Sequence, residues 1–332
     1  MAHMRYLIER NVLQTIPVAK FKYWDQTIPL FTKGEYPDGR KIVQQGITPT
    51  MVLFAADAAC TKSTGGPQSD WLTAIPTVTN GDMLGIRPDL VGRRIDSWAD
   101  VLSPEFKGKA AIQDNPTIGI IDVAMALEAR GDIKYGNKGN MPKEEIDKTV
   151  KTMLDIKQSG RFRSFWSSFD QSVNLMASGE VVIQSMWSPA VAAVRSRGIS
   201  CTFQPLKEGY RGWGYTLGVM KHVGGLKLDC FHEYMNWYAS GFEGSFIARE
   251  GYYSAQPDNA RKYLTPAEAA YWFDGKPAET DILSPFGKVM EKAGNVRDGG
   301  SLWERLGNVA VWNSVMDEDR YLTRRWNEFI TS

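Results

Sequence analysis

The chain has 332 residues and a formal net charge of +1, with 43% hydrophobic and 23% charged residues. This balance excludes wholesale disorder and offers no electrostatic footprint for nucleic acid or an anionic membrane. No apolar run approaches the ~20 residues that span a bilayer. The length suits about two domains, and the 11 Trp, 13 Tyr and 14 Phe are numerous enough to fill a core and also to line a binding cleft.

The N-terminal segment lacks the strand that would be expected before its first helix. Residues 1–4 (Met-Ala-His-Met) are expected to be a cloning remnant, and residues 5–10 read as the end of a helix with no strand before it. Residues 30–74 are rich in Gly and Pro turns, which predicts short strands and loops. Residues 73–87 alternate well enough to form one or two strands.

From residue 97 onward, strands followed by helices are typical of an α/β sheet. Strands are predicted at 110–112 and 181–183. Helices are predicted, in chain order, at 117–130, 143–158, 191–197, 228–249, 265–273 and 301–329. The fold class is therefore α/β, without internal repeats.

Enzyme and metal signatures are absent from the sequence. There is no phosphate-binding or dinucleotide-binding glycine motif, no H-E-x-x-H and no G-x-S-x-G. His222 and His232 read as surface or packing residues, so we expect no catalytic residue, no cofactor and no metal site. The cysteines, Cys60, Cys201 and Cys230, have no zinc-type spacing. Buried free thiols are favoured, although one disulfide remains open.

Two segments share a strand-to-helix pattern with a helix cap. In the first, Asn115 is the expected N-cap before Pro116, and in the second Ser188 precedes Pro189 in the same way. Ligands of open α/β sheets bind at such loops, and a helix start offers N–H groups to an anion such as a carboxylate. Well-capped helices of any α/β domain would look the same, but Trp187 beside the second cap favours a binding site.

Two further loops carry rings. The glycine-rich stretch 209–218 contains Trp213 and Tyr215, and the turn at 249–257 contains Tyr252 and Tyr253. Some of these rings will pack on their own domain. Several ring-bearing loops beside two capped helix starts nevertheless indicate a binding cleft better than a catalytic centre.

An ordered series of segments resembles a known family. Residues 95–109 (IDSWADVLSPEFKGK), residues 176–181, the Trp187 loop, Trp213 and the turn at 251–257 are similar to segments of the solute-binding proteins of bacterial ABC importers, with the spermidine/putrescine-binding type as the nearest branch. The resemblance covers nearly the whole chain. It implies a two-lobed, type II periplasmic-binding-protein fold, with crossing hinge strands and a cleft between the lobes in which Trp187 and Trp213 stack on the ligand.

The resemblance also suggests how the chain is divided. Lobe 1 is expected to comprise 5–87 and 213–285, and lobe 2 to comprise 88–212. The C-terminal helices in 286–332 are expected to pack on either lobe. The family's opening strand, aromatic-bearing loop and helix are expected to be missing, which would remove one wall of the cleft.

The predicted cleft departs from the polyamine-binding pattern. Asn115, Ile118 and Tyr215 stand where polyamine binders carry acidic residues, and Asp114 and Asp170 remain as possible anionic partners. A dication in a dry cleft would lack counter-charges. A mono-amine, a quaternary ammonium compound or a zwitterion such as γ-aminobutyrate (GABA) therefore fits better. Asn313 aligns roughly with a tail amide that reaches the ligand in the polyamine branch.

The sequence therefore predicts a periplasmic solute-binding protein, without catalytic activity, whose signal peptide has been removed. Its partners would be a small-molecule ligand and the membrane permease of an ABC importer, with no nucleic acid, and it would act as a monomer. A polyamine-binding protein is the alternative within the class. An enzyme on the same two-lobed fold and a scaffold with a vestigial cleft are the alternatives outside it.

Overall fold

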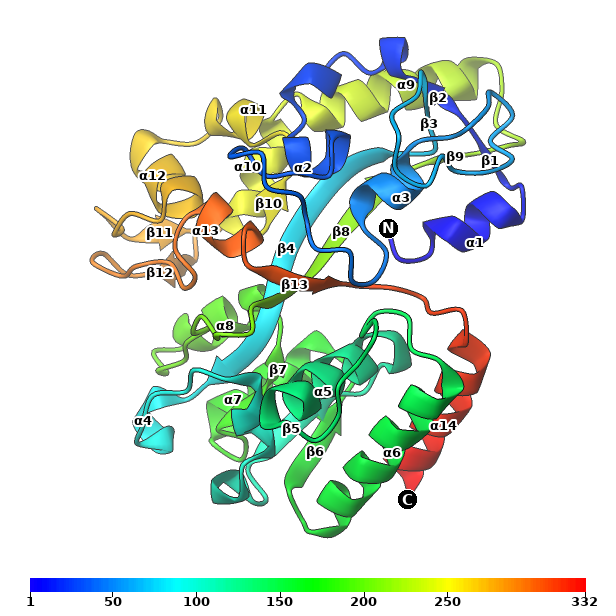
Figure 1. The fold of residues 1–332 in the computed structure, drawn as a ribbon. Coiled ribbons are helices and arrows are strands. Elements are labelled where there is room, and N and C mark those ends of the chain that lie inside the picture. Colours follow the sequence, from blue (N-terminus) through cyan, green and yellow to red (C-terminus); the bar gives the residue numbers. More distant parts are fainter.

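One long strand, β4 (Ile75–Ile86), runs through both halves of the molecule, and all twelve of its residues are buried. Residues 75–82 pair antiparallel with β8 (Tyr210–Leu217), whereas residues 83–86 pair antiparallel with β7 (Ile183–Met186). The computed structural model describes residues 1–332, and in it β4 runs from the upper lobe into the lower lobe (Figure 1). The predicted strand at 73–87 is confirmed as one continuous element.

The remaining strands extend this sheet on both sides, in the order β13-β8-β4-β7-β5-β6 with β10 also paired to β4. β5 (Ala110–Gln113) is parallel to both β6 (Phe162–Trp166) and β7. β13 (Val309–Trp312) is parallel to β8, and β10 (Tyr253–Ser254) is antiparallel to β4. The result is a sheet of mixed parallel and antiparallel strands that is shared by two lobes. The fold class is α/β, as the sequence predicted.

The lower lobe in Figure 1 surrounds β5, β6 and β7 with helices. They are α4 (Pro88–Val91), α5 (Pro116–Arg130), α6 (Lys143–Gln158), α7 (Phe169–Ser178), α8 (Ser188–Arg195) and α14 (Asp319–Thr331). The last helix of the chain, α14, packs against α5 and α6.

The upper lobe contains the other helices and three small sheets (Figure 1). The helices are α1 (Met4–Glu9), α2 (Pro29–Thr32), α3 (Pro49–Leu53), α9 (Leu226–Ala239), α10 (Phe242–Arg249), α11 (Pro257–Arg261), α12 (Pro266–Asp274) and α13 (Leu302–Leu306). The small sheets pair β1 (Leu13–Gln14) with β9 (Val219–Met220), β2 (Ile16–Pro17) with β3 (Trp71–Leu72), and β11 (Ile282–Leu283) with β12 (Val289–Glu291).

The predicted helical tail at 301–329 is wrong, because β13 separates α13 from α14. The predicted helix at 228–249 is two helices, interrupted at Gly241. This glycine has a φ of +120°, and a Cβ on it would come within 2.1 Å of the Asn259 carbonyl oxygen, so the chain turns where no other residue fits. The strand predicted at 181–183 begins later, at Ile183.

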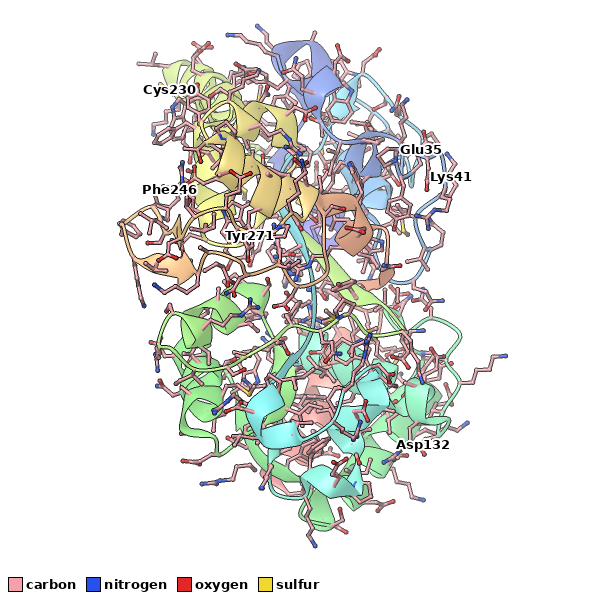
Figure 2. All side chains as sticks on the ribbon, turned by 90° about the vertical axis from the view of Figure 1, so that its left-hand side faces the viewer. Glu35, Lys41, Asp132, Cys230, Phe246 and Tyr271 are labelled. Atoms are coloured by element: carbon pink, nitrogen blue, oxygen red, sulfur yellow. The ribbon has the colours of Figure 1, made fainter.

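The cysteine prediction is only partly correct. All three thiols are free, and Cys60 and Cys201 are buried. Burial raises the pKa of Cys201 to about 12, which makes this thiol unreactive. Cys230 is exposed on the outer face of α9, as Figure 2 shows.

Candidate ligand-binding cleft

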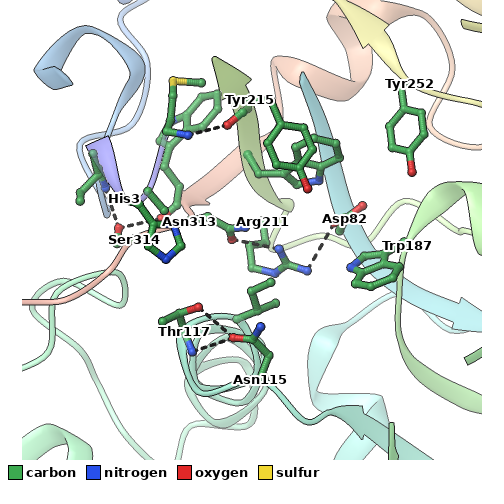
Figure 3. Close-up of a pocket in the computed structure, with 17 residues that line it drawn as sticks. His3, Asp82, Asn115, Thr117, Trp187, Arg211, Tyr215, Tyr252, Asn313 and Ser314 are labelled. Atoms are coloured by element: carbon green, nitrogen blue, oxygen red, sulfur yellow. Dashed lines mark hydrogen bonds and ion pairs between the residues drawn. The ribbon is translucent and has the colours of Figure 1, made fainter. Parts of the chain in front are cut away.

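A cavity of about 320 Å³ opens where the two lobes face each other. Its size falls within the range of small-molecule sites. Six of the ten predicted site residues line it, namely Asn115, Trp187, Trp213, Tyr215, Tyr252 and Asn313. Figure 3 shows Asn115, Trp187, Tyr215, Tyr252 and Asn313 around the cavity.

Trp187, at the end of β7, forms one aromatic wall. Its ring meets Trp166 edge-on, with centroids 5.0 Å apart and planes at 90°, and it stacks on Phe169 at 6.4 Å and 22°. Trp166 is itself fixed, because its indole N–H donates to the Ser185 carbonyl oxygen at 3.1 Å. These contacts hold the Trp187 ring in place before any ligand arrives.

Trp213, on β8, forms the second aromatic wall. Its ring lies 5.1 Å from Tyr215 and 5.8 Å from Tyr252, centroid to centroid. Tyr215 is 63% exposed, so part of this wall faces solvent. The two walls present several ring faces, and ring faces attract ammonium groups through the aromatic quadrupole.

A buried charge cluster lies at the cavity wall between these rings (Figure 3). The Arg211 guanidinium donates to Asp122 Oδ1 at 2.6 Å, to Asn313 Oδ1 at 2.9 Å and, more weakly, to Asp82 Oδ2 at 3.4 Å. The three charged side chains are at most 2% exposed. Because Arg211 comes from β8, Asp82 from β4, Asp122 from α5 and Asn313 from the end of β13, the cluster joins the crossing strands to the lower lobe.

This cluster carries one more negative than positive charge when both carboxylates are ionised. Burial raises the pKa of Asp82 to about 6, while the Arg211 cation opposes the shift and Asp122 adds to it. Asp82 Oδ1 has no hydrogen-bond partner. The indole N–H of Trp213 lies close enough to lower this pKa slightly, although its geometry falls short of a hydrogen bond. A cation in the cavity would compensate the excess charge.

The helix starts do not offer the N–H groups that we expected for a carboxylate. Asn115 caps α5 as predicted, but its side-chain oxygen already accepts the Thr117 N–H at 3.0 Å. Its backbone carbonyl oxygen accepts the N–H groups of Ile118 and Gly119. The expected cap at Ser188 is wrong: the N-cap of α8 is Trp187, without a side-chain cap bond. Its carbonyl oxygen accepts the N–H groups of residues 190 and 191, so neither helix start presents a row of free donors.

Four predicted site residues lie outside the cavity. Asp114 accepts a hydrogen bond from the Trp326 indole at 3.0 Å, and Asp170 is exposed in the first turn of α7. Ser188 accepts from Arg305 at 3.2 Å, on the far side of β4. Tyr253 is fully buried, with its backbone paired to Thr79 of β4 and its ring centroid 6.2 Å from that of Phe273.

Sequence reasoning missed Asp82 and Arg211, and it also missed Thr117 and Ser314 at the cavity wall. A signal for Asp82 was present, because β4 reads Thr-Val-Thr-Asn-Gly-Asp at 77–82. Such polar residues are rare in a strand buried along its whole length, unless they pair with one another or serve a site.

The first residues of the chain also line the cavity. The Met1 ammonium donates to the Gly214 carbonyl oxygen at 2.9 Å, and Ala2 and His3 lie beside it. Burial lowers the pKa of this ammonium to about 6. No group of three or more His, Cys, Asp or Glu side chains is placed to hold a metal ion. No helix has the length and apolar character needed to cross a membrane.

Two α/β lobes joined by crossing strands, with an aromatic cavity between them, define a two-lobed solute-binding protein. Sequence comparison agrees, because the profile of the family described as bacterial extracellular solute-binding proteins matches residues 2–241. The chain belongs to this family. Its members are transport proteins rather than enzymes: they capture small ligands outside the cytoplasm, and those of ABC importers interact with a permease.

Solved structures with low sequence identity share the fold. A spermidine/putrescine ABC transporter protein from Listeria monocytogenes is 13% identical, with a TM-score of 0.63 over 99% of this chain and 81% of that one. An ABC transporter substrate-binding protein from Bradyrhizobium japonicum is 14% identical, with a TM-score of 0.59 over 99% and 80%. A GABA receptor is 16% identical, with a TM-score of 0.57 over 98% and 79%. A search of curated protein sequences found no match.

Proposed function

We propose that this protein is the periplasmic solute-binding component of an ABC importer and that it captures a small solute carrying one ammonium group. The observation that supports this ligand class is the aromatic cavity with an excess negative charge at its wall. The ammonium group would lie between the Trp187 and Trp213 walls, near Asp82. The solute is then delivered to the permease, with the protein acting as a monomer.

The physical argument for a cation has two parts. Ring faces contribute roughly 0.5–2 kcal/mol to binding an ammonium group, with the larger value in a desolvated site. Asp82 and Asp122 share one guanidinium, and in a buried site an uncompensated carboxylate is costly. A bound cation supplies the missing charge, so its binding is favoured over that of a neutral molecule of equal size.

The same argument disfavours the polyamine alternative. A second ammonium group needs a second counter-charge, but Asp82 is the one carboxylate at this cavity wall, and Asp114 and Asp170 lie elsewhere. A zwitterion such as GABA is less favoured than a simple amine, because the N–H groups at the start of α5 already have partners. Its carboxylate would have to compete with Asp82 and Asp122 for the Arg211 guanidinium, or use neutral amides such as those of Asn115 and Asn313.

We propose that the lobes close on the solute by bending about the crossing strands β4, β8 and β13. The proposed division keeps residues 5–87 and 213–285 in one lobe and 88–212 in the other. The contacts of α14 with α5 and α6 favour assigning that helix to the second lobe. Closure would bring Trp187 and Trp213, which belong to different lobes in this division, onto opposite sides of the ligand.

Isothermal titration calorimetry with five probes tests the ligand class: n-butylamine, choline, GABA, putrescine and spermidine. We expect binding of butylamine or choline, weaker binding of GABA and the weakest binding of the two polyamines. Trp187→Ala should weaken the best ligand roughly tenfold. Trp237→Ala is the control, because that ring is 47% exposed on α9, outside the cavity.

Heat from the polyamines alone would contradict the mono-amine proposal and favour the polyamine alternative. Recovery of the ligand chemically unchanged after prolonged incubation separates a binding protein from an enzyme on the same fold. If none of the probes raises the melting temperature or gives heat, the capture of small amines is excluded and the cleft has another use.

A further inference from the structure

A second, partly open cavity lies on the other side of β4 from the cleft, and three arginines border it. It measures about 20 Å³, and α8 of the lower lobe bounds it on one side, while α12, β12 and α13 bound it on the other. Tyr271, labelled in Figure 2 near the junction of the two lobes, lies at its wall. A cavity of this volume holds a single particle about the size of a water molecule.

Two of the three arginines have no carboxylate partner. The Arg297 guanidinium donates to the carbonyl oxygens of Trp272 and Gly251, and Arg305 donates to Asn80 Oδ1 at 3.4 Å and Ser188 Oγ at 3.2 Å. All four acceptors are neutral. Arg297 is 5% exposed and Arg305 is fully buried, and a buried charge without a counter-charge is costly.

The third arginine already uses the carboxylates at this cavity. Arg195 forms salt bridges with Glu291 at 3.1 Å and with Asp298. Among the side chains that line this cavity, three guanidinium groups therefore face two carboxylates, which leaves one positive charge in excess. The nearby carboxylate of Asp82 acts on Arg305 but does not line the cavity. Burial, with a smaller contribution from the Arg305 cation, lowers the pKa of Arg297 to about 10, while Tyr253, Tyr271 and Glu291 oppose the shift.

Unused hydrogen-bond donors surround the same cavity. Arg305 Nε and Trp272 Nε1 have no acceptor, although both side chains are at least 98% buried and line the cavity. The backbone closes tightly over Arg305 at Gly299, where φ is +79° and a Cβ would lie 3.1 Å from Arg305 Nε. A single bound anion would accept hydrogen bonds from the unpartnered donors and would also balance the excess positive charge.

We propose that this cavity binds one small monovalent anion of halide size, held by Arg297 and Arg305. The site is separate from the solute cleft and does not depend on the proposed function. A halide fits the volume and accepts from several N–H donors at once. Sulfate carries two negative charges and would overcompensate the single excess positive charge, and water fits but leaves the positive charge in place.

The test is the melting temperature of the full chain in sodium gluconate, with chloride replacing gluconate at constant ionic strength. We expect a saturable rise of about 3 °C with chloride or bromide, and none with sulfate beyond its general salting-out effect. Arg305→Met should abolish the halide-dependent part of the rise. Arg93→Met is the matched control, because Arg93 pairs with Asp100 and Glu105 on the surface.

Crystals of the wild-type protein grown in sodium bromide provide a second readout that does not depend on the folding of any variant. An anomalous difference peak beside Arg305 Nε is expected. A cavity that contains only water, seen as density without anomalous signal, overturns the proposal. So does a halide effect of equal size in wild type and Arg305→Met, since the ion would then act elsewhere.

Discussion

Two buried charge clusters lie on opposite sides of the same strand, and they differ in sign. In the cleft, Asp82 and Asp122 share Arg211, and each contact is a hydrogen-bonded ion pair. Behind β4, Arg297 and Arg305 donate only to neutral acceptors. Asn80 and Asp82, two residues apart on β4, contact Arg305 and Arg211 respectively, and the Arg305 cation also acts on Asp82. One side of the hinge is therefore suited to a cation and the other to an anion.

The difference shows how a nearly neutral protein can hold strong local fields. The net charge of +1 over 332 residues conceals an excess negative charge in the cleft and an excess positive charge behind it. Burial strengthens both fields, because the effective dielectric around buried charges is far below that of water. The following predictions test whether the two clusters differ as their partners indicate, beginning with the largest effect.

Arg211→Met should destabilise the protein far more than Arg305→Met does. Removing Arg211 leaves two buried carboxylates without a counter-charge, which typically costs about 3–5 kcal/mol. Removing Arg305 eliminates a cation that has no carboxylate partner, so we expect a loss of less than about 1.5 kcal/mol. Urea unfolding at pH 7 measures both. Equal losses would mean that the two clusters are energetically alike and would remove the basis of the comparison.

Asp82→Asn should remove the preference of the cleft for a cation. We expect wild type to bind n-butylamine at least tenfold more tightly than 1-butanol, and the variant to bind both about equally. Asp122→Asn is the matched control, because it removes the same charge from a residue that contacts Arg211 but does not line the cavity. Its effect should be smaller. Calorimetric titration with n-butylamine and 1-butanol measures this preference. An unchanged ratio of the two affinities in Asp82→Asn would contradict a role for this carboxylate.

Much of the binding cleft could be predicted from local sequence. The rings at Trp187, Trp213 and Tyr252, and the cap at Asn115, sit in short motifs whose chemistry is visible within a few residues. Arg211 and Asp82 could not be found this way. Their ion pairs join residues 89 and 129 positions apart, and only the folded sheet brings them together.

Strand β13 escaped prediction for a different reason. Its four residues, Val309–Trp312, form an apolar run too short to distinguish strand from helix, with helical sequence on both sides. Only pairing with β8 selects the strand. The position of Asn313 at the cavity wall follows from that pairing, so its prediction depended on family resemblance rather than on local pattern. Trp237 shows that an aromatic residue need not belong to the core or to the cleft, since its ring lies exposed beside Tyr234.

The affinity for n-butylamine should fall about tenfold between pH 7 and pH 5. The pKa of Asp82 is raised to about 6 in the folded protein, so the carboxylate loses its charge over this range while the amine keeps its own. The stability of the free protein changes in the opposite direction. Because the folded pKa lies above the unfolded value, protonation of Asp82 stabilises the fold as pH falls from about 6 to 4.

Other titratable groups near Asp82 must be separated from its effect. Asp122 and Arg211 contact it or share its cluster, Arg305 approaches from behind β4, and the Tyr252 phenol faces it. Across the cavity, the Met1 ammonium, with a pKa of about 6, also gains charge on acidification. The pH dependence should therefore shrink in Asp82→Asn. If it persists in full, the ammonium of Met1, rather than Asp82, controls the pH dependence of binding.

The smallest effect should come from a surface cluster with the same number of ion pairs as Arg211. Arg93 pairs with Asp100 and Glu105 at 2.7 and 2.8 Å, yet its side chain is 39% exposed. Solvent screens such pairs, and we expect Arg93→Ala to cost less than about 1 kcal/mol in urea unfolding. A loss comparable with that of Arg211→Met would show that the number of ion pairs determines stability here. A small loss would show that burial does, since both arginines bridge two carboxylates and differ mainly in their exposure to water.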